Sequence, residues 1–243
     1  MNKEINNIKI NEDSEVVLNS KFKRWTDHIE KNLRERSPSR DVCYKEGLDK
    51  ELLEFCETHA KKYQTEKSGK KTVILTHPFY ILFSNMHKIR TEDMKKEVEE
   101  YLEKLANFLK IKRDNAGVRV ISLETIHHYA AATSLLLEGG LIDKTIFTLY
   151  DEGYTLNPEE LEPYKNDEIF FGGGYNNYCL KISIKEMKKI SSGEIWAIQE
   201  LILNSPRKGI DTLKPKHVYG LPKSRVINLE EAVKRMGLIS KVI

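Results

Sequence analysis

Four residues of this chain could form a catalytic set, and each follows a stretch with the pattern of a strand. His77 comes after the apolar run TVIL, Glu124 after VRVISL, Asp151 after TIFTLY, and Cys179 after EIFF and a glycine turn. A thiol activated by an imidazole that a carboxylate orients is a nucleophilic arrangement. The sequence therefore indicates a candidate catalytic set with Cys179 as nucleophile, His77 as base, and Glu124 or Asp151 as the acid.

Cys179 is expected at or near the start of a helix, since an amphipathic pattern begins around Leu180. The positive end of a helix dipole lowers the pKa of a thiol, and neighbouring backbone N–H groups can stabilise an oxyanion. The alternative is structural, because cysteine is small and apolar and suits the first buried position of a helix.

Three consecutive glycines precede this cysteine and suggest a ligand loop. Glycine N–H groups between a strand and a helix can cradle a phosphate or carboxylate, and a following mixture of Tyr and Asn can stack on a flat ligand and bind its edge. The three glycines match neither of the nucleotide-binding patterns G-x-G-x-x-G and G-x-x-x-x-G-K-[ST]. Glycines after a strand also serve tight turns or close packing. The candidate ligand-binding residues are Gly172, Gly173, Gly174, Tyr175, Asn176 and Asn177.

The order strand, glycine loop, cysteine, helix from Phe170 to Met187 resembles the nucleophile segment of isochorismatase-like cysteine hydrolases. The resemblance implies a hydrolase with Cys179 as its nucleophile. That family also has an Asp at the end of its first strand and a Lys further along. This chain has Thr76 and His77 at the first of these places, so the similarity is one of arrangement.

A second constellation lies at the end of the expected second strand. Glu124 with His127 or His128 falls on one helical face and could supply two metal ligands, with a third from His77 or Asp151. The alternative is a helix start at which the histidines cap or pack. We assign no metal site, and the sequence identifies no cofactor.

These groups require an alternating series of strands and helices to position them. Strands are expected at 72–75, 118–123, 145–150 and 168–171, and they are continuous apolar runs, as in a sheet buried on both faces. Helices are expected at 21–36, 48–64, 91–111, 125–138, 180–190, 194–204 and 229–237, with a short one opening at Asn157. His217–Tyr219 and Arg225–Ile227 are further short-strand candidates.

Successive strand–helix–strand units predict an α/β fold of three layers, with a mostly parallel sheet of at least four strands and helices on both faces. We expect a helical N-terminal segment over 1–70, an α/β core over 71–205 and an irregular extension with a terminal helix over 206–243. In an open parallel sheet, ligands bind beyond the carboxyl ends of the strands, which is where the candidate groups fall.

Composition narrows the class of protein. The 243 residues are 40% hydrophobic and 32% charged with a net charge of +3, a globular balance too weakly basic to predict a nucleic-acid partner by itself. Cys43, Cys56 and Cys179 are an odd, widely spaced set without zinc-site spacing, which is typical of reduced thiols. No membrane-spanning run or secretory signal is expected, so we predict a cytoplasmic protein without a membrane partner.

Three functions remain open from the sequence. The first is binding of a small anionic or planar ligand through the glycine loop, and the second is a cysteine-dependent hydrolase. The third is a non-catalytic scaffold for protein or nucleic acid. Its contact surface would be the basic face of the helix at 21–36, and the alternative for that face is an ordinary solvated one.

Overall fold

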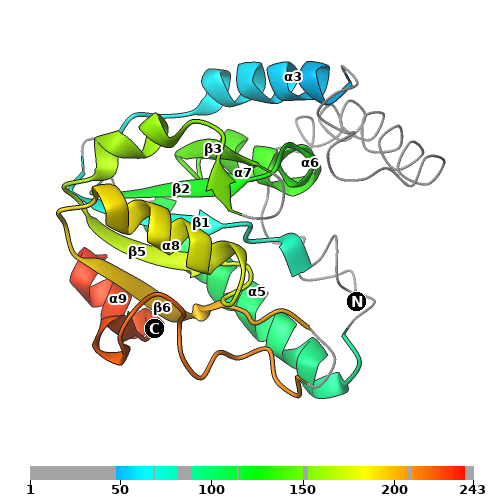
Figure 1. Ribbon diagram of the computed structural model, residues 1–243, viewed down its shortest axis with the longest axis vertical. Coiled ribbons are helices and arrows are strands. Elements are labelled where there is room, and N and C mark those ends of the chain that lie inside the picture. The colour runs from blue at the N-terminus through cyan, green and yellow to red at the C-terminus, as the bar shows by residue number, and fades with distance from the viewer. Residues whose placement is uncertain are drawn as a thin grey trace.

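The computed structural model describes residues 48–67, 69–81, 89–113, 115, 117–149, 153–206 and 210–238. These residues form one sheet and the helices that cover it (Figure 1). The strands lie in the order β4-β3-β2-β1-β5-β6-β7, and every pair is parallel except β3 with β4. Their bounds are β1 Lys71–Thr76, β2 Val118–Glu124, β3 Lys144–Leu149, β4 Tyr154–Thr155, β5 Glu168–Gly173, β6 Ile195–Ile202 and β7 Val226–Ile227.

Helices cover both faces of this sheet, which confirms the predicted three-layer α/β fold. One apolar cluster joins residues of α3, α5, the 126–138 segment and α9, and the other joins residues of α8 and the 158–164 helix. The bounds are α3 Leu48–Tyr63, α5 Glu92–Arg113, α6 Ile126–His128, the π-helical η3 Tyr129–Thr133, α7 Ser134–Glu138, α8 Cys179–Ile190 and α9 Leu229–Met236, with 3-10 helices η5 Pro158–Tyr164 and η6 Lys223–Arg225.

The central strands are apolar throughout because each of their two faces is covered. In β1, Val73 and Leu75 belong to the cluster beneath α5, while Ile74 between them belongs to the cluster beneath α8. Side chains alternate across a strand, so a strand with no solvated face needs apolar residues at successive positions.

The order of the strands creates one special position. From central β1 the chain builds outward through β2 and β3, then returns to the other side of β1 and builds outward through β5, β6 and β7. The direction of winding therefore reverses between β1 and β5. The crevice outside the carboxyl ends of two such strands is where open α/β sheets bind ligands.

Capping residues mark the boundaries of two helices. The Thr91 hydroxyl accepts a hydrogen bond of 3.1 Å from the Met94 N–H before α5. The Asn228 side chain accepts one of 2.7 Å from the Glu231 N–H before α9. Gly237 follows α9 in the left-handed region, with a φ of 69°. These bonds satisfy N–H groups that the first helical turn leaves unpaired.

Two predicted elements are wrong. The segment predicted as a helix at 194–204 contains strand β6, and His217–Tyr219 forms no strand. In β6, Ile195 and Ala197 belong to one apolar cluster while Trp196 and Ile198 belong to the other, so a strand buried on both faces produces the apolar spacing. The two-residue strand β4 was not predicted, since two residues carry no periodicity.

Within the described residues, no helix combines the length and the apolar character needed to cross a membrane.

Candidate functional site

The candidate residues lie at the carboxyl ends of β1, β2 and β5, which are adjacent in the sheet. Thr76 of β1 pairs with Leu123 of β2 on one side and with Gly173 of β5 on the other. His77 follows β1 directly, and Cys179 is the first residue of α8 after β5. The sheet therefore brings three of the four candidate catalytic residues to neighbouring strand ends. The fourth, Asp151, lies outside the described residues, as do Cys43 and the predicted basic helix at 21–36.

The glycines allow the backbone of β5 to approach the end of β1. Gly173 has a φ of 107°, and a Cβ there would lie 2.2 Å from the carbonyl oxygen of Thr76. A Cβ on Gly174 would lie 2.8 Å from the carbonyl oxygen of His77, and the Gly174 N–H donates a 2.5 Å hydrogen bond to Thr76. Neither approach leaves room for a side chain.

The loop after the glycines is held by the side chain of Asn176, which is buried. Its amide nitrogen donates to the Asn204 side chain at 3.1 Å and to the His217 carbonyl oxygen at 2.7 Å, while its oxygen accepts from the Tyr219 N–H at 3.0 Å. Asn176 thus ties the loop to two later segments of the chain. The neighbouring Asn177 has a buried side-chain oxygen without a hydrogen-bond partner in the described part of the chain.

His77 has an unusual backbone and an unusual side chain. Its φ is 44°, and no other non-glycine residue in the described ranges has a positive φ. Its N–H donates to the Leu123 carbonyl oxygen at 2.8 Å, and its Nε2 shares a 2.9 Å hydrogen bond with the hydroxyl of Thr148 on β3. Its Nδ1 is buried and has no hydrogen-bond partner among the described residues.

The imidazole of His77 is neutral at physiological pH. The side chain is fully buried, and burial, with a smaller effect from His128, lowers its pKa to about 3. A base with so low a pKa accepts a proton poorly near neutrality. As a neutral ring, however, His77 can donate or accept a hydrogen bond through Nδ1, depending on its tautomer.

Glu124 and His128 form a second buried polar group next to His77. Nδ1 of His128 lies 3.3 Å from one carboxylate oxygen of Glu124, and the hydroxyl of Thr133 donates to the other at 3.0 Å. Thr133 ends the π-helical turn η3, and such turns often occur at functional sites. The backbone of His127 belongs to α6, and no ligand role is assigned to it.

Aromatic rings join these groups into one cluster, and the ring of Tyr80 lies at its centre. The Tyr80 ring centroid is 5.0 Å from that of Tyr175, 5.1 Å from that of His128 and 6.2 Å from that of His77. We call these four residues, with Glu124 and Tyr101, the His77 cluster. The sequence did not single out Tyr80 or Tyr101, because neither follows a predicted strand directly.

Tyr101, on α5, connects this cluster to a helix that covers the sheet. Its hydroxyl donates a 2.9 Å hydrogen bond to the carbonyl oxygen of Pro78. Burial raises the pKa of Tyr101, and the nearby groups of Glu124, Cys179 and Tyr175 raise it further. Groups from β2, α8 and the β5–α8 loop therefore act on a single phenol.

The thiol of Cys179 lies inside the protein. Its side chain is 1% exposed, and its sulfur is 3.9 Å from the carbonyl oxygen of Tyr175 one helical turn earlier. The position at the start of α8 is the predicted one, and it would favour a thiolate. The burial is that of a cysteine packed in an apolar core.

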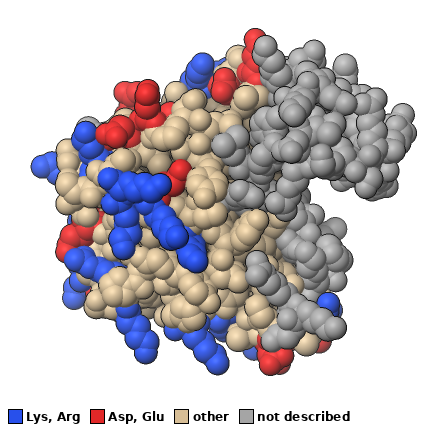
Figure 2. All heavy atoms as spheres, in the orientation of Figure 1, with Lys and Arg blue, Asp and Glu red and all other residues tan. Residues whose placement is uncertain are grey.

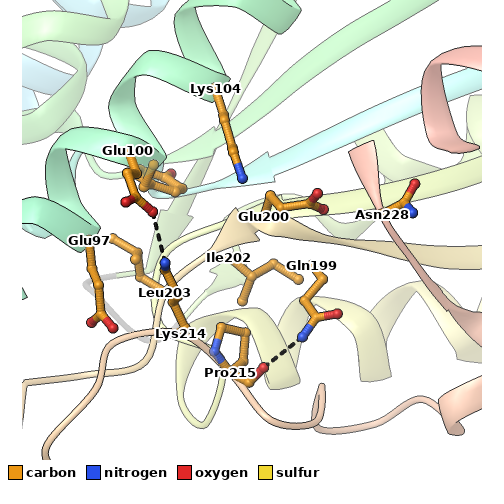
Figure 3. Close-up of a pocket in the computed structure, with 11 residues that line it drawn as sticks. Glu97, Glu100, Lys104, Gln199, Glu200, Ile202, Leu203, Lys214, Pro215 and Asn228 are labelled. Atoms are coloured by element: carbon orange, nitrogen blue, oxygen red, sulfur yellow. Dashed lines mark hydrogen bonds and ion pairs between the residues drawn. The ribbon is translucent and has the colours of Figure 1, made fainter. Parts of the chain in front are cut away.

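A separate pocket of about 250 Å³ opens beside the cluster, between α5 and the end of β6 (Figure 3). Glu100 pairs with Lys214 at 2.8 Å across it, and Lys104 extends from α5 toward its middle. Tyr101 borders both this pocket and the His77 cluster. The lining residues are Glu97, Glu100, Tyr101, Lys104, Gln199, Glu200, Ile202, Leu203, Lys214, Pro215 and Asn228.

Over the described ranges, His, Cys, Asp and Glu residues form no group of three or more suited to hold a metal ion. Comparison with known proteins assigns no family, since no protein-family model matches the chain and no curated protein is significantly similar to it.

Proposed function

We propose that this chain binds a small planar molecule at the carboxyl ends of β1 and β5, with His77 at the centre of the site. The observation that carries the proposal is the buried Nδ1 of His77, which has no partner among the described residues at the one point where the sheet reverses its winding. An unpaired buried polar atom costs about 1–3 kcal/mol, and a ligand atom bonded to it would recover that free energy.

The backbone of His77 supports the same proposal. A left-handed conformation is unfavourable for a residue with a Cβ and costs on the order of 1–3 kcal/mol where it is sparsely populated. Such strain is found most often at ligand and active sites. His77 therefore carries two unfavourable features at one place, and both are accounted for if the residue is positioned for a ligand rather than for packing alone.

The surroundings of His77 favour a planar ligand over a strongly anionic one. Tyr80, Tyr175 and His128 offer ring faces and edges, against which flat molecules pack well. The buried carboxyl group of Glu124 and a neutral His77 provide no positive charge for an anion. In this proposal Gly172, Gly173 and Gly174 shape the crevice, Asn176 holds the loop, and Tyr175 and Asn177 contact the ligand.

A thermal-shift and calorimetric comparison of three probes tests this function. Benzamide is neutral and planar, benzoate is planar but anionic, and cyclohexanecarboxamide is neutral but not planar. We expect benzamide to raise the melting temperature most, because ligand binding to the native state alone stabilises it. If cyclohexanecarboxamide stabilises the protein equally, or no planar probe binds, the proposal is wrong.

The variant His77→Asn removes the ring while keeping the backbone conformation accessible, since asparagine tolerates positive φ better than most residues. We expect it to lose the benzamide shift. The matched control is His217→Asn, which changes an exposed histidine outside the cluster. Retention of the shift by His77→Asn would show that the probe binds elsewhere.

A cysteine-dependent hydrolase is the second candidate, supported by the position of Cys179 at the start of α8 on the strand end next to His77. Its test is the rate of iodoacetamide alkylation at about pH 7, resolved by peptide mapping into Cys43, Cys56 and Cys179. A nucleophile should react faster than glutathione. Burial raises the pKa of Cys56, which serves as the unreactive internal reference. If Cys179 reacts as slowly as Cys56, this candidate is excluded.

A further inference from the structure

The solvent-facing side of α8 is a continuous row of lysines. Successive helical residues are about 100° apart, which places the buried side chains of α8 on one arc and its lysines on the opposite arc. The buried residues are Cys179, Leu180, Ser183, Ile184 and Met187. The lysines are the half-buried Lys181 and the exposed Lys185, Lys188 and Lys189, and the half-buried Ile182 lies at the edge of their arc.

No carboxylate of the described residues forms an ion pair with these lysines. The one acidic residue of α8, Glu186, points to the side, where it accepts a 3.2 Å hydrogen bond from the N–H of Thr155. Figure 2 shows Lys and Arg side chains gathered where α8 crosses the front of the molecule. Apart from an electrostatic attraction between Glu186 and Lys189, the described residues therefore give this row of lysines no carboxylate partner.

Two exposed tyrosines flank this helix. Tyr154 and Tyr219 are 42% and 38% exposed, and they are the exposed large hydrophobic residues of the described part of the chain. The β4 segment that holds Tyr154 contacts α8 through Thr155 and Glu186, and the Lys181 ammonium lies 5.7 Å from the centroid of the Tyr219 ring. Positions 181 and 186 lie about 140° apart around a helix, so the tyrosines lie on different sides of the lysines.

We propose that this α8 surface, made of the four lysines with Tyr154 and Tyr219, binds single-stranded nucleic acid. Lysines that follow a sugar-phosphate backbone and tyrosines that stack on unpaired bases are the two elements of sequence-tolerant single-strand binding. An acidic peptide would pair with the lysines but has no bases to stack on two separated tyrosine rings. A bilayer would require apolar side chains to insert, and the exposed arc offers only Ile182. The inference does not depend on the proposed function of the His77 cluster.

Fluorescence anisotropy with a labelled oligouridylate of roughly 16 nucleotides tests the proposal on the full chain. The charge-reversal variant is Lys185→Glu with Lys189→Glu. Its matched control is Lys96→Glu with Lys110→Glu, which makes the same change in net charge on the exposed side of α5. We expect a large loss of affinity for the first variant only. We also expect the slope of log affinity against log salt to weaken by about 0.7 for each phosphate that the variant no longer neutralises.

Tyr154→Ala and Tyr219→Ala test the stacking part separately. Each should weaken binding by roughly fivefold or more at any salt concentration while leaving the salt slope unchanged, because no charge is removed. Circular dichroism on every variant distinguishes weaker binding by a folded protein from unfolding.

Several results would overturn the inference. The first is no binding by the wild-type chain at about 50 mM salt. The second is an equal loss in the α5 control, which would mean that net charge alone is responsible. The third is equal competition by duplex DNA, or binding to phosphatidylserine vesicles as tight as to the oligouridylate. Either would show a polyanion or membrane surface that does not distinguish single strands.

Discussion

At the scale of single residues, His77 shows how burial decides what a histidine can do. Its usual role as a proton acceptor near neutrality depends on a pKa close to 6.5, and burial has lowered that pKa to about 3. The residue is therefore better suited to hold a hydrogen-bonding group in a fixed orientation than to shuttle protons. This is why binding ranks above thiol activation among the proposed functions.

The same shift predicts a pH dependence of stability. Between the folded pKa of about 3 and the ordinary value of 6.5, the unfolded chain binds a proton at His77 that the folded chain does not. The stability contributed by His77 is therefore complete above about pH 6.5 and is lost as the pH falls toward 3, at about 1.4 kcal/mol per pH unit. From about pH 6.5 to pH 5 the loss is about 2 kcal/mol.

Urea unfolding of the wild type and of His77→Asn at both pH values measures this effect. We expect the free energy of unfolding of the variant to fall by about 2 kcal/mol less than that of the wild type over this range. His217→Asn, at an exposed site, should retain the wild-type dependence. Equal slopes for wild type and His77→Asn would mean that the imidazole is not buried as described.

At the scale of elements, Gly173 is needed for the close pairing of β5 with β1, whether or not the glycine loop binds a ligand. Alanine at Gly173 would place a Cβ 2.2 Å from the Thr76 carbonyl oxygen, in a backbone conformation of φ 107°. We expect Gly173→Ala to lower the free energy of unfolding by more than about 4 kcal/mol, or to prevent folding.

Gly140→Ala is the matched control, because Gly140 also has a positive φ, 68°, but a Cβ added there would have no atom within 4 Å. It should cost only the conformational strain, about 1–2 kcal/mol. Chemical denaturation of both variants separates strain from collision. A similar loss in both would show that contact with β1 is not what requires Gly173.

Some of the strands and helices could be predicted from the sequence, and others could not. Strands β1, β2, β3 and β5 could be predicted because each is an apolar run bounded by a turn or a proline. Helices α5 and α9 could be predicted because a capping residue and an amphipathic repeat coincide. β6 could not, because Trp196, Ile198, Leu201 and Ile202 have a spacing that suits a helix face as well as a strand buried on both sides.

The candidate site was predictable in the same partial way. Position at a strand end identifies His77, Glu124 and Cys179, since parallel strands place their carboxyl ends at one edge. Tyr80, Tyr101, Thr133 and Thr148 join them only through the strand order and the π-helical turn, which depend on contacts distant in the sequence. The burial that makes His77 neutral and encloses Cys179 is likewise a property of the assembled layers.

At the scale of the whole molecule, a buried ion pair lies at the amino ends of the strands, across the sheet from the His77 cluster. Lys112, at the end of α5, pairs with Asp143, which precedes β3, and both side chains are almost fully buried. Asp143 also accepts a 2.7 Å hydrogen bond from the Val120 N–H and pairs with Lys67 at 3.0 Å. One carboxylate thus joins β2, β3, α5 and the segment after α3, away from the His77 cluster.

This pair gives the stability of the molecule a second pH dependence, which falls in the alkaline range, whereas that of His77 falls in the acidic range. Burial lowers the pKa of Lys112 from 10.5 to about 8, although Asp143 partly opposes the shift. Between these values the unfolded chain holds a proton that the folded chain has released, so the Lys112 contribution to the free energy of unfolding increases with pH, at about 1.4 kcal/mol per unit. Lys112→Met removes the titrating group while keeping an unbranched apolar stem in its place.

Denaturant unfolding of the wild type and Lys112→Met at about pH 7.5 and pH 9.5 measures this contribution as a difference. Tyr101, Tyr129 and Cys56 have raised pKa values and lower the stability of both proteins in alkali, so their effect cancels in the comparison. We expect the wild type to gain on the order of 2 kcal/mol relative to the variant between the two pH values. A constant difference would mean that Lys112 stays protonated, held by Asp143 strongly enough to outweigh its burial. Because the pair lies at the amino edge of the sheet, benzamide binding at pH 7.5 should be the same in both proteins, which separates the stability of the scaffold from the chemistry of the site.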